Sequence, residues 1–336
     1  MAPYFPFVVT SIDVESDPSK DASAIVAQYG PGAKAIMFSG KIQADLKDPD
    51  AVVLLDVQQE TKEDEDGKNV HMFYGVEVPM EKFKAEIKKT GKSFFAYVHG
   101  FQTEPEDSFA TCHEIQSYPD FPRTVIPVIW PSVGALKTHE YLTSDKYNKE
   151  QAITKAAGEA FSVTAELGSE SEVNLALMCH SMGNRCFFSF ASQQSLDPIK
   201  RFDRIFMVAA DVWEEVYNTR VIEKHKWPPQ ISFNEWGDTG LKVVRMLKEN
   251  GKVHCIHNPK DLALAGSIVE NWRKRIGVFG IKAQNDRDRV HEECKEFIQD
   301  FDMSSTEESK KQADEAMANH CYQSAPCVIE YYMEHL

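Results

Sequence analysis

The sequence feature that most constrains the fold is an apolar run, Val173–Met178, that ends in Cys-His-Ser-Met-Gly-Asn-Arg at positions 179–185. A short apolar run bounded by turn formers predicts a buried strand of a parallel sheet. A helix beginning near Gly183 would leave Ser181 in a tight strand-to-helix turn, with its hydroxyl exposed at the sheet edge, as in a nucleophile elbow. The usual pattern is Gly-x-Ser-x-Gly, and Cys179 meets the need for a small first residue at some steric cost. From these residues alone, an ordinary strand-to-helix turn is an equal alternative.

A second apolar run, Ser93–Val98, ends at His99, Gly100 and Phe101. A backbone N–H at such a strand end can be turned toward an acyl oxygen, which would make this loop the second half of an oxyanion hole. The alternative is that His99 is a packed histidine and Gly100 a simple turn residue. Because this segment precedes the elbow along the chain, the two segments together favour the catalytic interpretation over two ordinary turns.

The composition disfavours several classes of protein. The chain has 336 residues, 42% of them hydrophobic, which is enough for one α/β domain with a full core. The formal net charge of −15 argues against a nucleic-acid partner, because phosphate contacts need clustered Lys and Arg, and it also disfavours an anionic membrane surface. No apolar run approaches the length of a membrane span, and Met1–Thr10 lacks the regions of a signal peptide. We therefore expect a first strand there and no stable membrane insertion.

The cysteines indicate the redox setting. Seven occur, with no Cys-x-x-Cys pair, and an odd set of this kind predicts a reducing, cytoplasmic location. Cys321 and Cys327 lie near His320, but no second ligand pair accompanies them at the spacing of a zinc site. We expect no metal and no cofactor.

The pattern of predicted secondary structure changes near residue 90. Residues 1–90 indicate strands and hairpins joined to the same sheet as the rest, with the acidic segment 60–68 as a solvated hairpin loop. Residues 91–336 alternate apolar strands with helical patterns, which is typical of a parallel α/β sheet. The predicted strands are Tyr4–Ile12, Ala33–Ile42, Ala51–Thr61, Val70–Val78, Phe94–Val98, Thr124–Ile129, Asn174–Met178, Arg204–Ala209, Lys252–His257 and Glu296–Asp302. The predicted helices are Glu106–Ser117, Lys149–Leu167, Gly183–Gln193, Gly240–Asn250, Ala265–Arg275 and Pro326–His335.

Candidate catalytic residues follow the ends of the predicted strands. Asp211, Asp261 and His320 each come after one of the last three strands. Ligands of open α/β sheets bind beyond the carboxyl ends of the strands, so these side chains are expected at one edge. With Ser181 the order along the chain is Ser, Asp, His, which is the order of α/β-hydrolases.

These motifs together resemble a family of unknown function within the α/β-hydrolase superfamily. The His-Gly-aromatic, Trp-Pro-Ser and His-Ser-Met-Gly-Asn-Arg motifs carry the resemblance, and the last two are the most specific. The resemblance implies an α/β-hydrolase fold with a mostly parallel central sheet flanked by helices, here with an N-terminal β-rich extension. The matching segments are Val98–Phe101, Ile129–Ser132, Cys179–Arg185, Asn258–Leu264 and Asn319–Tyr322.

Carried over by position, the resemblance implies Ser181 as nucleophile, His320 as base and Asp261 as the acid that orients it. Met182 and Phe101 would supply the N–H groups of the oxyanion hole. The chemistry needs these residue types, because a serine hydroxyl requires a neutral imidazole within hydrogen-bond reach and a carboxylate to fix its tautomer.

Alternatives exist for the base and the acid. His320 is the only histidine between the final strand and the final helix, whereas His180, next to the serine, would be directed elsewhere by the elbow. Asp261 is favoured as the acid because it follows the penultimate strand. Asp211 is the alternative acid, and it could also be a helix N-cap or a polar residue of the site wall.

Residues 212–238 form an aromatic insertion at the same edge, with Trp213, Trp227 and Trp236 among them. As a lid, the insertion would present apolar surface to an acyl or aryl group. Packing of the insertion against its own scaffold is an equal alternative. The expected substrate-contacting residues are His99, Gly100, Trp130 and Trp213.

The expected function is a serine hydrolase that cleaves a carboxylic ester or thioester of a small-molecule acyl substrate through an acyl-enzyme. An acyltransferase or lactone-forming enzyme with the same triad is the first alternative. A non-catalytic binding module on a hydrolase fold is the second. The sequence specifies neither the acyl group nor the oligomeric state.

Overall fold

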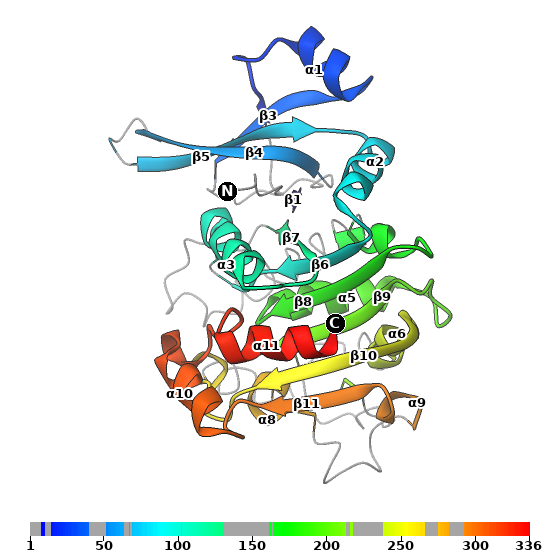
Figure 1. Ribbon diagram of the computed structural model, residues 1–336, viewed down its shortest axis with the longest axis vertical. Helices are drawn as coiled ribbons and strands as arrows, with labels where there is room; N and C mark the ends of the chain where they lie inside the picture. Colours follow the sequence, from blue (N-terminus) through cyan, green and yellow to red (C-terminus); the bar gives the residue numbers. More distant parts are fainter. Residues whose placement is uncertain are drawn as a thin grey trace, which may run out of the picture. The chain divides into compact units, whose positions relative to one another are not determined.

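The computed structural model consists of two compact units, Met1–Leu167 and Gly168–Leu336 (Figure 1). Within its described residues no helix is both long enough and apolar enough to cross a membrane. The structure describes residues 8–10, 15–39, 52–63, 67, 69–101, 103–130, 161–162, 164–212, 216–217, 238–265, 275–281 and 292–336.

The first unit is built on a mixed sheet. Its strands are β1 Val8–Thr10, β2 Glu15–Ser16, β3 Lys34–Ser39, β4 Val52–Glu63, β5 Asn69–Glu77, β6 Ser93–Val98 and β7 Thr124–Ile129. They lie in the order β6-β7-β1-β4-β5-β3-β2. Pairing is parallel from β6 through β7 to β1 and antiparallel beyond it. The N-terminal strands therefore extend the sheet that contains β6, whose last five residues are buried as expected for a parallel strand.

Among the described residues, the first unit has the helices α1 Ala22–Tyr29, α2 Met80–Thr90 and α3 Pro105–Ser117, besides the helical residues 161–162 and 164–167. The sequence prediction of strands and hairpins alone before residue 90 is wrong for α1 and α2. In α2 only Phe83 and Ile87, four residues apart, are buried, and the other positions are mostly charged. Two apolar residues give a weak helical period between strongly apolar strands, which explains why the pattern did not reveal the helix.

In the part of the second unit that the structure describes, four strands lie in the order β8-β9-β10-β11, all parallel. They are β8 Asn174–His180, β9 Phe202–Val208, β10 Leu247–His257 and β11 Ile298–Asp302. Six of the seven residues of β8 are buried, because helices lie on both faces of this part of the sheet. The predicted α/β class, with a mostly parallel sheet and a β-rich N-terminal extension, is confirmed.

The start of β10 differs from the prediction of a helix through Asn250. The helix α6 covers only Thr239–Arg245, and β10 begins at Leu247. The pairing of β10 with β9 shifts register between Leu247 and Lys252. Asn250 has a φ of 61°, a left-handed conformation that Asn tolerates but a helix does not, so a bulged strand forms there.

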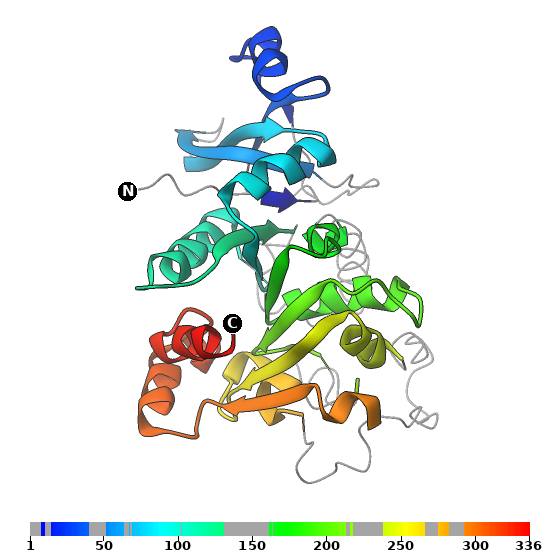
Figure 2. The same ribbon diagram turned by 45° about the vertical axis from the view of Figure 1, so that its right-hand side comes forward.

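The remaining helices of the second unit flank its strands. They are α5 Gly183–Gln193, α8 Ile276–Phe279, α9 Glu292–Lys295, α10 Glu307–Glu315, the 3₁₀ turn η3 Met317–Asn319 and α11 Pro326–His335. Figures 1 and 2 show α11 on one face of these strands and α5 and α6 on the other. On the α11 face, the ring of Tyr332 contacts that of Phe206 on β9. On the opposite face, the ring of Phe187 on α5 contacts that of Phe202, also on β9. The bounds of α5 and α11 agree with the sequence prediction.

Several predicted segments fall mainly outside the described residues. They include most of the helix predicted at Lys149–Leu167, of which 161–162 and 164–167 are helical, and nearly all of that at Ala265–Arg275. The aromatic insertion 212–238 is described only at residues 212, 216–217 and 238, and Trp213 is not among them. The lid hypothesis therefore stays a prediction.

Candidate active site

The turn after β8 has the geometry of an elbow. Ser181 has a φ of 51°, in the left-handed region that residues other than glycine rarely adopt, and α5 begins two residues later. The Ser181 N–H donates to Val208 O on the neighbouring strand at 2.9 Å. Such backbone strain persists only where the surroundings fix the conformation, and it clusters at functional sites.

Donors around the Ser181 carbonyl fix this conformation. Asn184 Nδ2 donates to Ser181 O at 3.0 Å and to Cys179 O at 2.8 Å. The backbone N–H of Asp211 also donates to Ser181 O, at 3.2 Å. The elbow is therefore hydrogen-bonded both to the first turn of α5 and to the segment that follows β9.

Asp261 and His320 are brought together by the structure. His320 Nδ1 lies 2.6 Å from Asp261 Oδ2, and both residues are buried. Burial raises the pKa of Asp261, and the hydrogen bond from His320 opposes this rise. The second carboxylate oxygen accepts from the Leu264 N–H at 2.8 Å, which fixes the carboxylate plane. A carboxylate at Nδ1 requires the proton there, so in the neutral form of the ring Nε2 is the acceptor nitrogen.

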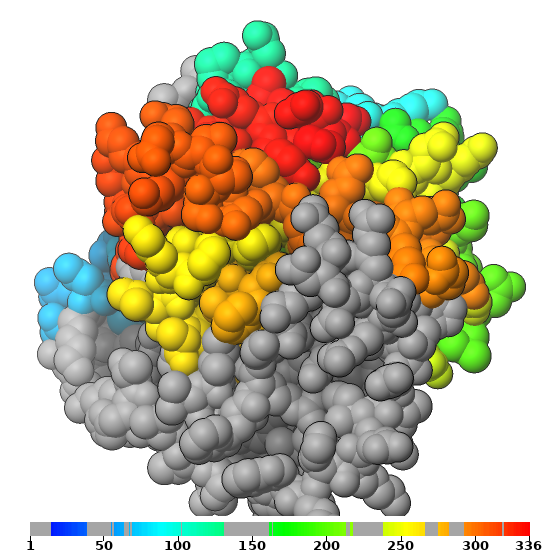
Figure 3. Space-filling view, turned by 90° about the horizontal axis from the view of Figure 1, so that it is seen from below, coloured from blue at the N-terminus to red at the C-terminus, as the bar shows by residue number. Residues whose placement is uncertain are grey.

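Asn258 connects the loops that carry the two residues. Its Nδ2 donates to Asn319 O at 2.9 Å, directly before His320, while its Oδ1 accepts from the Lys260 N–H at 3.0 Å, directly before Asp261. The Asp–His contact is thus supported by hydrogen bonds from the preceding residue on each side. Figure 3 shows residues 258–265 in yellow next to the orange segment at 275–281 on this side of the unit.

His180 lies against His320, contrary to the expectation that the elbow would direct it elsewhere. The two ring centroids are 4.9 Å apart, and His180 Nε2 donates to His320 O at 3.3 Å. Among the described residues no hydrogen bond joins the Ser181 hydroxyl to His320, so His180 is the direct contact between the elbow and the histidine loop. Sequence reasoning missed it because the partners are 140 residues apart and only tertiary packing unites them.

Asp211, the alternative acid, has guanidinium partners. Its Oδ2 lies 2.7 Å from Arg185 Nη2, and its Oδ1 lies 3.0 Å from Arg275 Nε. The Nδ1 atom of His320 is already bonded to Asp261. These contacts favour Asp261 over Asp211 as the partner of the imidazole.

Met182 stands at the N-terminus of α5, where helix N–H groups point outward and the helix dipole favours negative charge. In the described part of the chain its N–H has no protein acceptor, although the residue is buried. A buried N–H of this kind, next to the elbow serine and without an acceptor in the described part of the chain, is the type of donor that an oxyanion hole uses.

The family follows from the sequence comparison. Residues 78–330, about three quarters of the chain, match the sequence model of the family described as alpha/beta hydrolase of unknown function (DUF900). The chain belongs to this family. The resemblance and the α/β-hydrolase fold expected from the motifs are thereby confirmed.

Other comparisons of this hydrolase are distant. The LpqC poly(3-hydroxybutyrate) depolymerase of Bordetella parapertussis is 13% identical, with a TM-score of 0.37 over 94% of this chain and 95% of that one. A candidate esterase from Staphylococcus aureus is 14% identical, with a TM-score of 0.27 over 73% and 74%. At these scores neither structure carries an argument about the hydrolase. No curated protein sequence matches it significantly.

The corner formed by His99 and Trp130, in the first unit of the hydrolase, is internally satisfied. His99 Nε2 accepts from the Trp130 N–H at 3.1 Å, and the indole N–H donates to His99 O at 2.8 Å. His99 Nδ1 donates to Gly100 O at 2.9 Å. Burial lowers the pKa of His99 to about 4, so the ring is neutral. These contacts favour a packed histidine over the expected contact with substrate.

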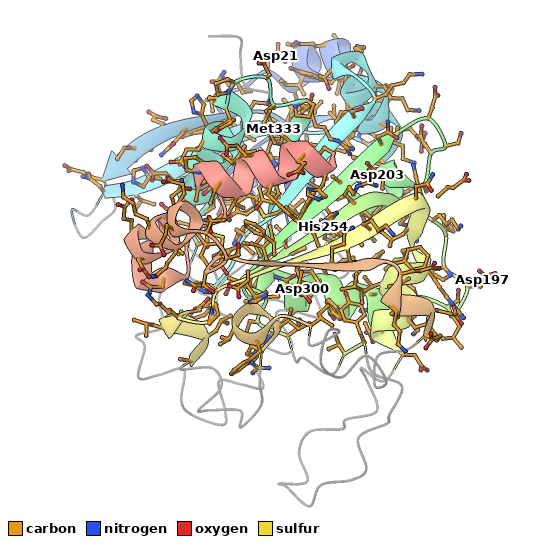
Figure 4. All side chains as sticks on the ribbon, turned by 60° about the horizontal axis from the view of Figure 1, so that its bottom comes forward. Asp21, Asp197, Asp203, His254, Asp300 and Met333 are labelled. Carbon is orange, nitrogen blue, oxygen red and sulfur yellow. The ribbon has the colours of Figure 1, made fainter. Side chains whose placement is uncertain are left out.

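Two other groups with shifted pKa values lie on neighbouring strands of the second unit: His254 contacts α11, whereas Asp300 Oδ1 accepts from the Ile281 N–H at 3.0 Å. Figure 4 labels His254 on β10 and Asp300 on β11. Burial lowers the pKa of His254 to about 3, and burial raises the pKa of Asp300 to about 6. His254 Nδ1 is 3.0 Å from the Tyr331 hydroxyl of α11, so this histidine anchors the C-terminal helix.

Proposed function

We propose that the protein is a serine hydrolase that cleaves a carboxylic ester or thioester through an acyl-enzyme, with Ser181, His320 and Asp261 as its triad. The observation that carries the proposal is the buried contact of 2.6 Å between His320 Nδ1 and Asp261 Oδ2, next to a serine in a strained elbow. The order of the three residues along the chain and the membership of an α/β-hydrolase family support it.

In the proposed mechanism, Ser181 Oγ attacks the acyl carbon while His320 Nε2 takes its proton. Asp261 holds the proton on Nδ1 and stabilises the imidazolium that forms. The Met182 N–H donates to the oxyanion of the tetrahedral intermediate. His320 then protonates the leaving alcohol or thiol. In the second step water attacks the acyl carbon while His320 Nε2 takes its proton, and His320 returns this proton to Ser181 Oγ as the acid leaves. Hydrogen bonds between base and nucleophile often form fully only with substrate bound, as this mechanism requires.

The second oxyanion donor, the N–H of Phe101, rests on the sequence motif. A proline at position 101 would remove this N–H, but it would also restrain the backbone. We therefore propose to replace the amide bond between Gly100 and Phe101 by an ester bond through semisynthesis, which removes the N–H alone. A loss of about a hundredfold in kcat is expected for one oxyanion donor. An unchanged kcat would assign the second donor elsewhere.

The direct test is labelling with a fluorophosphonate and peptide mapping of the label. We expect the label on Ser181, and we expect Ser181→Ala to fold normally and to lose at least about a thousandfold in hydrolysis of p-nitrophenyl esters. Ser132, in the Trp-Pro-Ser motif, is the competing serine. A label on Ser132 would overturn the assignment, and failure of the folded protein to label at all would favour a binding module.

The same labelled intermediate separates hydrolysis from acyl transfer. With an added alcohol or amine, a hydrolase releases mainly free acid, whereas an acyltransferase forms the new ester or amide.

The cysteines support a location for the proposed hydrolase. Since all seven cysteines are free, and five of them are buried, a reducing compartment such as the cytoplasm suits the protein.

A further inference from the structure

We propose that residues 275–280, called here the strap, are a positioning device that holds the Ser181 elbow and the His320 loop in register. The inference rests on the proposed function, because it assigns no chemistry to the strap itself. It names Arg275 and Gly277 as positioning residues, with Asp211 as the point where the strap meets the elbow.

On the elbow side the connection runs through Asp211. Its N–H donates to Ser181 O at 3.2 Å, so it is one of the groups that hold the strained serine in place. Arg275 Nε lies 3.0 Å from one carboxylate oxygen and Arg185 Nη2 lies 2.7 Å from the other. Arg185 Nε also donates to Asp211 O at 3.0 Å. Asp211 is therefore held by the strap and by the helix that follows the elbow.

The backbone of the strap continues this connection toward β10. The Ile276 N–H donates to Val212 O at 2.9 Å, and the Gly277 N–H donates to Ala210 O at 3.0 Å. Gly277 O in turn accepts from the Asn258 N–H at 3.0 Å. A single residue, Gly277, thus bonds to the segment after β9 on one side and to the segment after β10 on the other.

The close approach requires a glycine. A Cβ on Gly277 would lie 2.4 Å from the backbone carbon of Ala209 and 2.4 Å from Leu264 Cδ1. Any side chain would push the strap away from the end of β9. Ala209 itself has a φ of 45°, so the chain is turned sharply at the point that the strap contacts.

On the histidine side the connection runs through Asn258. This residue is buried, its N–H is bonded to the strap, and its side chain donates to Asn319 O at 2.9 Å, directly before His320. A continuous series of contacts therefore leads from the Ser181 carbonyl through Asp211, the strap and Asn258 to the histidine loop.

Burial of the ion pair supports a geometric role. Arg275 is 1% exposed and Asp211 is 3% exposed. Buried ion pairs add little net stability compared with well-packed apolar side chains, while a pair in good geometry fixes the relative positions of its partners. At this place the partners are the strap and the elbow.

The test compares Arg275→Lys with Arg245→Lys in the full chain. Both variants keep the charge, and Arg245 also joins two elements, since it pairs with Glu293 at 2.9 Å. Within the described residues its side chain bonds to Glu293 and to Leu196 O and not to the strap. A lysine cannot keep the planar guanidinium geometry. Amide hydrogen exchange of peptides covering Asp211 and Asn258 needs no activity. We expect exchange at both to rise about tenfold in Arg275→Lys and to stay unchanged in Arg245→Lys.

Kinetics with p-nitrophenyl esters give the second readout. We expect Arg275→Lys to lower kcat by about ten- to a hundredfold, with KM and the midpoint of the acid limb of the pH profile unchanged, because misplacement alone costs rate. Asp211→Asn, which keeps the shape of the side chain, is measured in parallel in case Arg275→Lys does not fold.

Unchanged exchange at either peptide overturns the strap, whatever the activity of the protein. A kcat within twofold of wild type, or a loss accompanied by a shifted acid limb, also overturns it, because the shift would mean an electrostatic effect on His320. Failure of the proposed function is distinguished by the wild-type protein, which would then neither label with fluorophosphonate nor hydrolyse esters.

Discussion

His320, directly after η3 in the second unit, and His99, directly after β6 in the first, are both buried histidines, yet their nitrogens have different partners. His99 uses both nitrogens on backbone groups of its own corner. His320 has a carboxylate at Nδ1, while Nε2 has no protein partner among the described residues. Burial and neighbouring motifs therefore do not distinguish the two histidines. The partners of their nitrogens do, and they are the reason why the proposed function assigns the base to His320.

The largest effect expected from this comparison follows removal of the carboxylate. Asp261→Asn should lower kcat for ester hydrolysis about ten-thousandfold, because an amide does not hold the proton on Nδ1. Asp314→Asn is the matched control, since Asp314 lies on α10 just before the His320 loop and pairs on the surface with Lys260, next to Asp261, at 3.1 Å. Equal losses in the two variants would assign the acid elsewhere.

The second prediction concerns the pH dependence of stability. The pKa of His99 is about 4 in the folded protein and 6.5 as the ordinary value, so the unfolded chain binds the proton more tightly. Its contribution to stability is full above pH 6.5 and is lost toward pH 4, at about 1.4 kcal/mol per pH unit. The free energy of unfolding, measured with urea at several pH values, should fall less steeply between pH 6.5 and pH 4 in His99→Phe than in the wild type.

His113→Phe is the control for this measurement, because His113 is exposed on α3. The wild-type slope should persist in that variant. If His99→Phe and wild type lose stability in parallel as the pH falls, His99 is not the buried neutral ring that its contacts indicate.

The smallest expected effect tests the contact between the elbow and the histidine loop. His180→Phe keeps a ring beside His320 but removes the hydrogen bond to its carbonyl, which is 3.3 Å long. A neutral hydrogen bond contributes about 1 kcal/mol, so we expect kcat to fall about fivefold with KM unchanged.

His254→Phe provides the comparison for His180→Phe. It replaces a buried histidine of the same unit that contacts α11, so it should change stability and leave kcat within about twofold of wild type. A thousandfold loss in His180→Phe would mean that His180 itself takes part in proton transfer.

Much of the architecture could be predicted from local signals. The strand Thr124–Ile129 and the helices Gly183–Gln193 and Pro326–His335 have the predicted bounds, because strong apolar runs and clear turn residues delimit them. The start of β10 could not be predicted in the same way. Lysine, glutamate and asparagine after Leu247 favour a helix or a loop, and only pairing with β9 makes this segment a bulged strand.

The site was predictable only in part for a related reason. Strand order predicts that Ser181, Asp261 and His320 share an edge, since carboxyl ends of parallel strands meet there. The choice between Asp261 and Asp211 depends on side-chain partners, and the two arginines that pair with Asp211 come from positions 26 residues before and 64 after it. No spacing in the sequence contains that information.

The left-handed backbone at Ser181 implies a conflict between folding and chemistry at one residue. Glycine adopts a φ of 51° without the steric cost that any side chain incurs there. Relief of this strain should make Ser181→Gly more stable than the wild type, and under the proposed function the same change removes the nucleophile, so selection for stability alone would not retain the serine. Under the proposed function, the serine at this position is kept for its reactivity at a cost in stability.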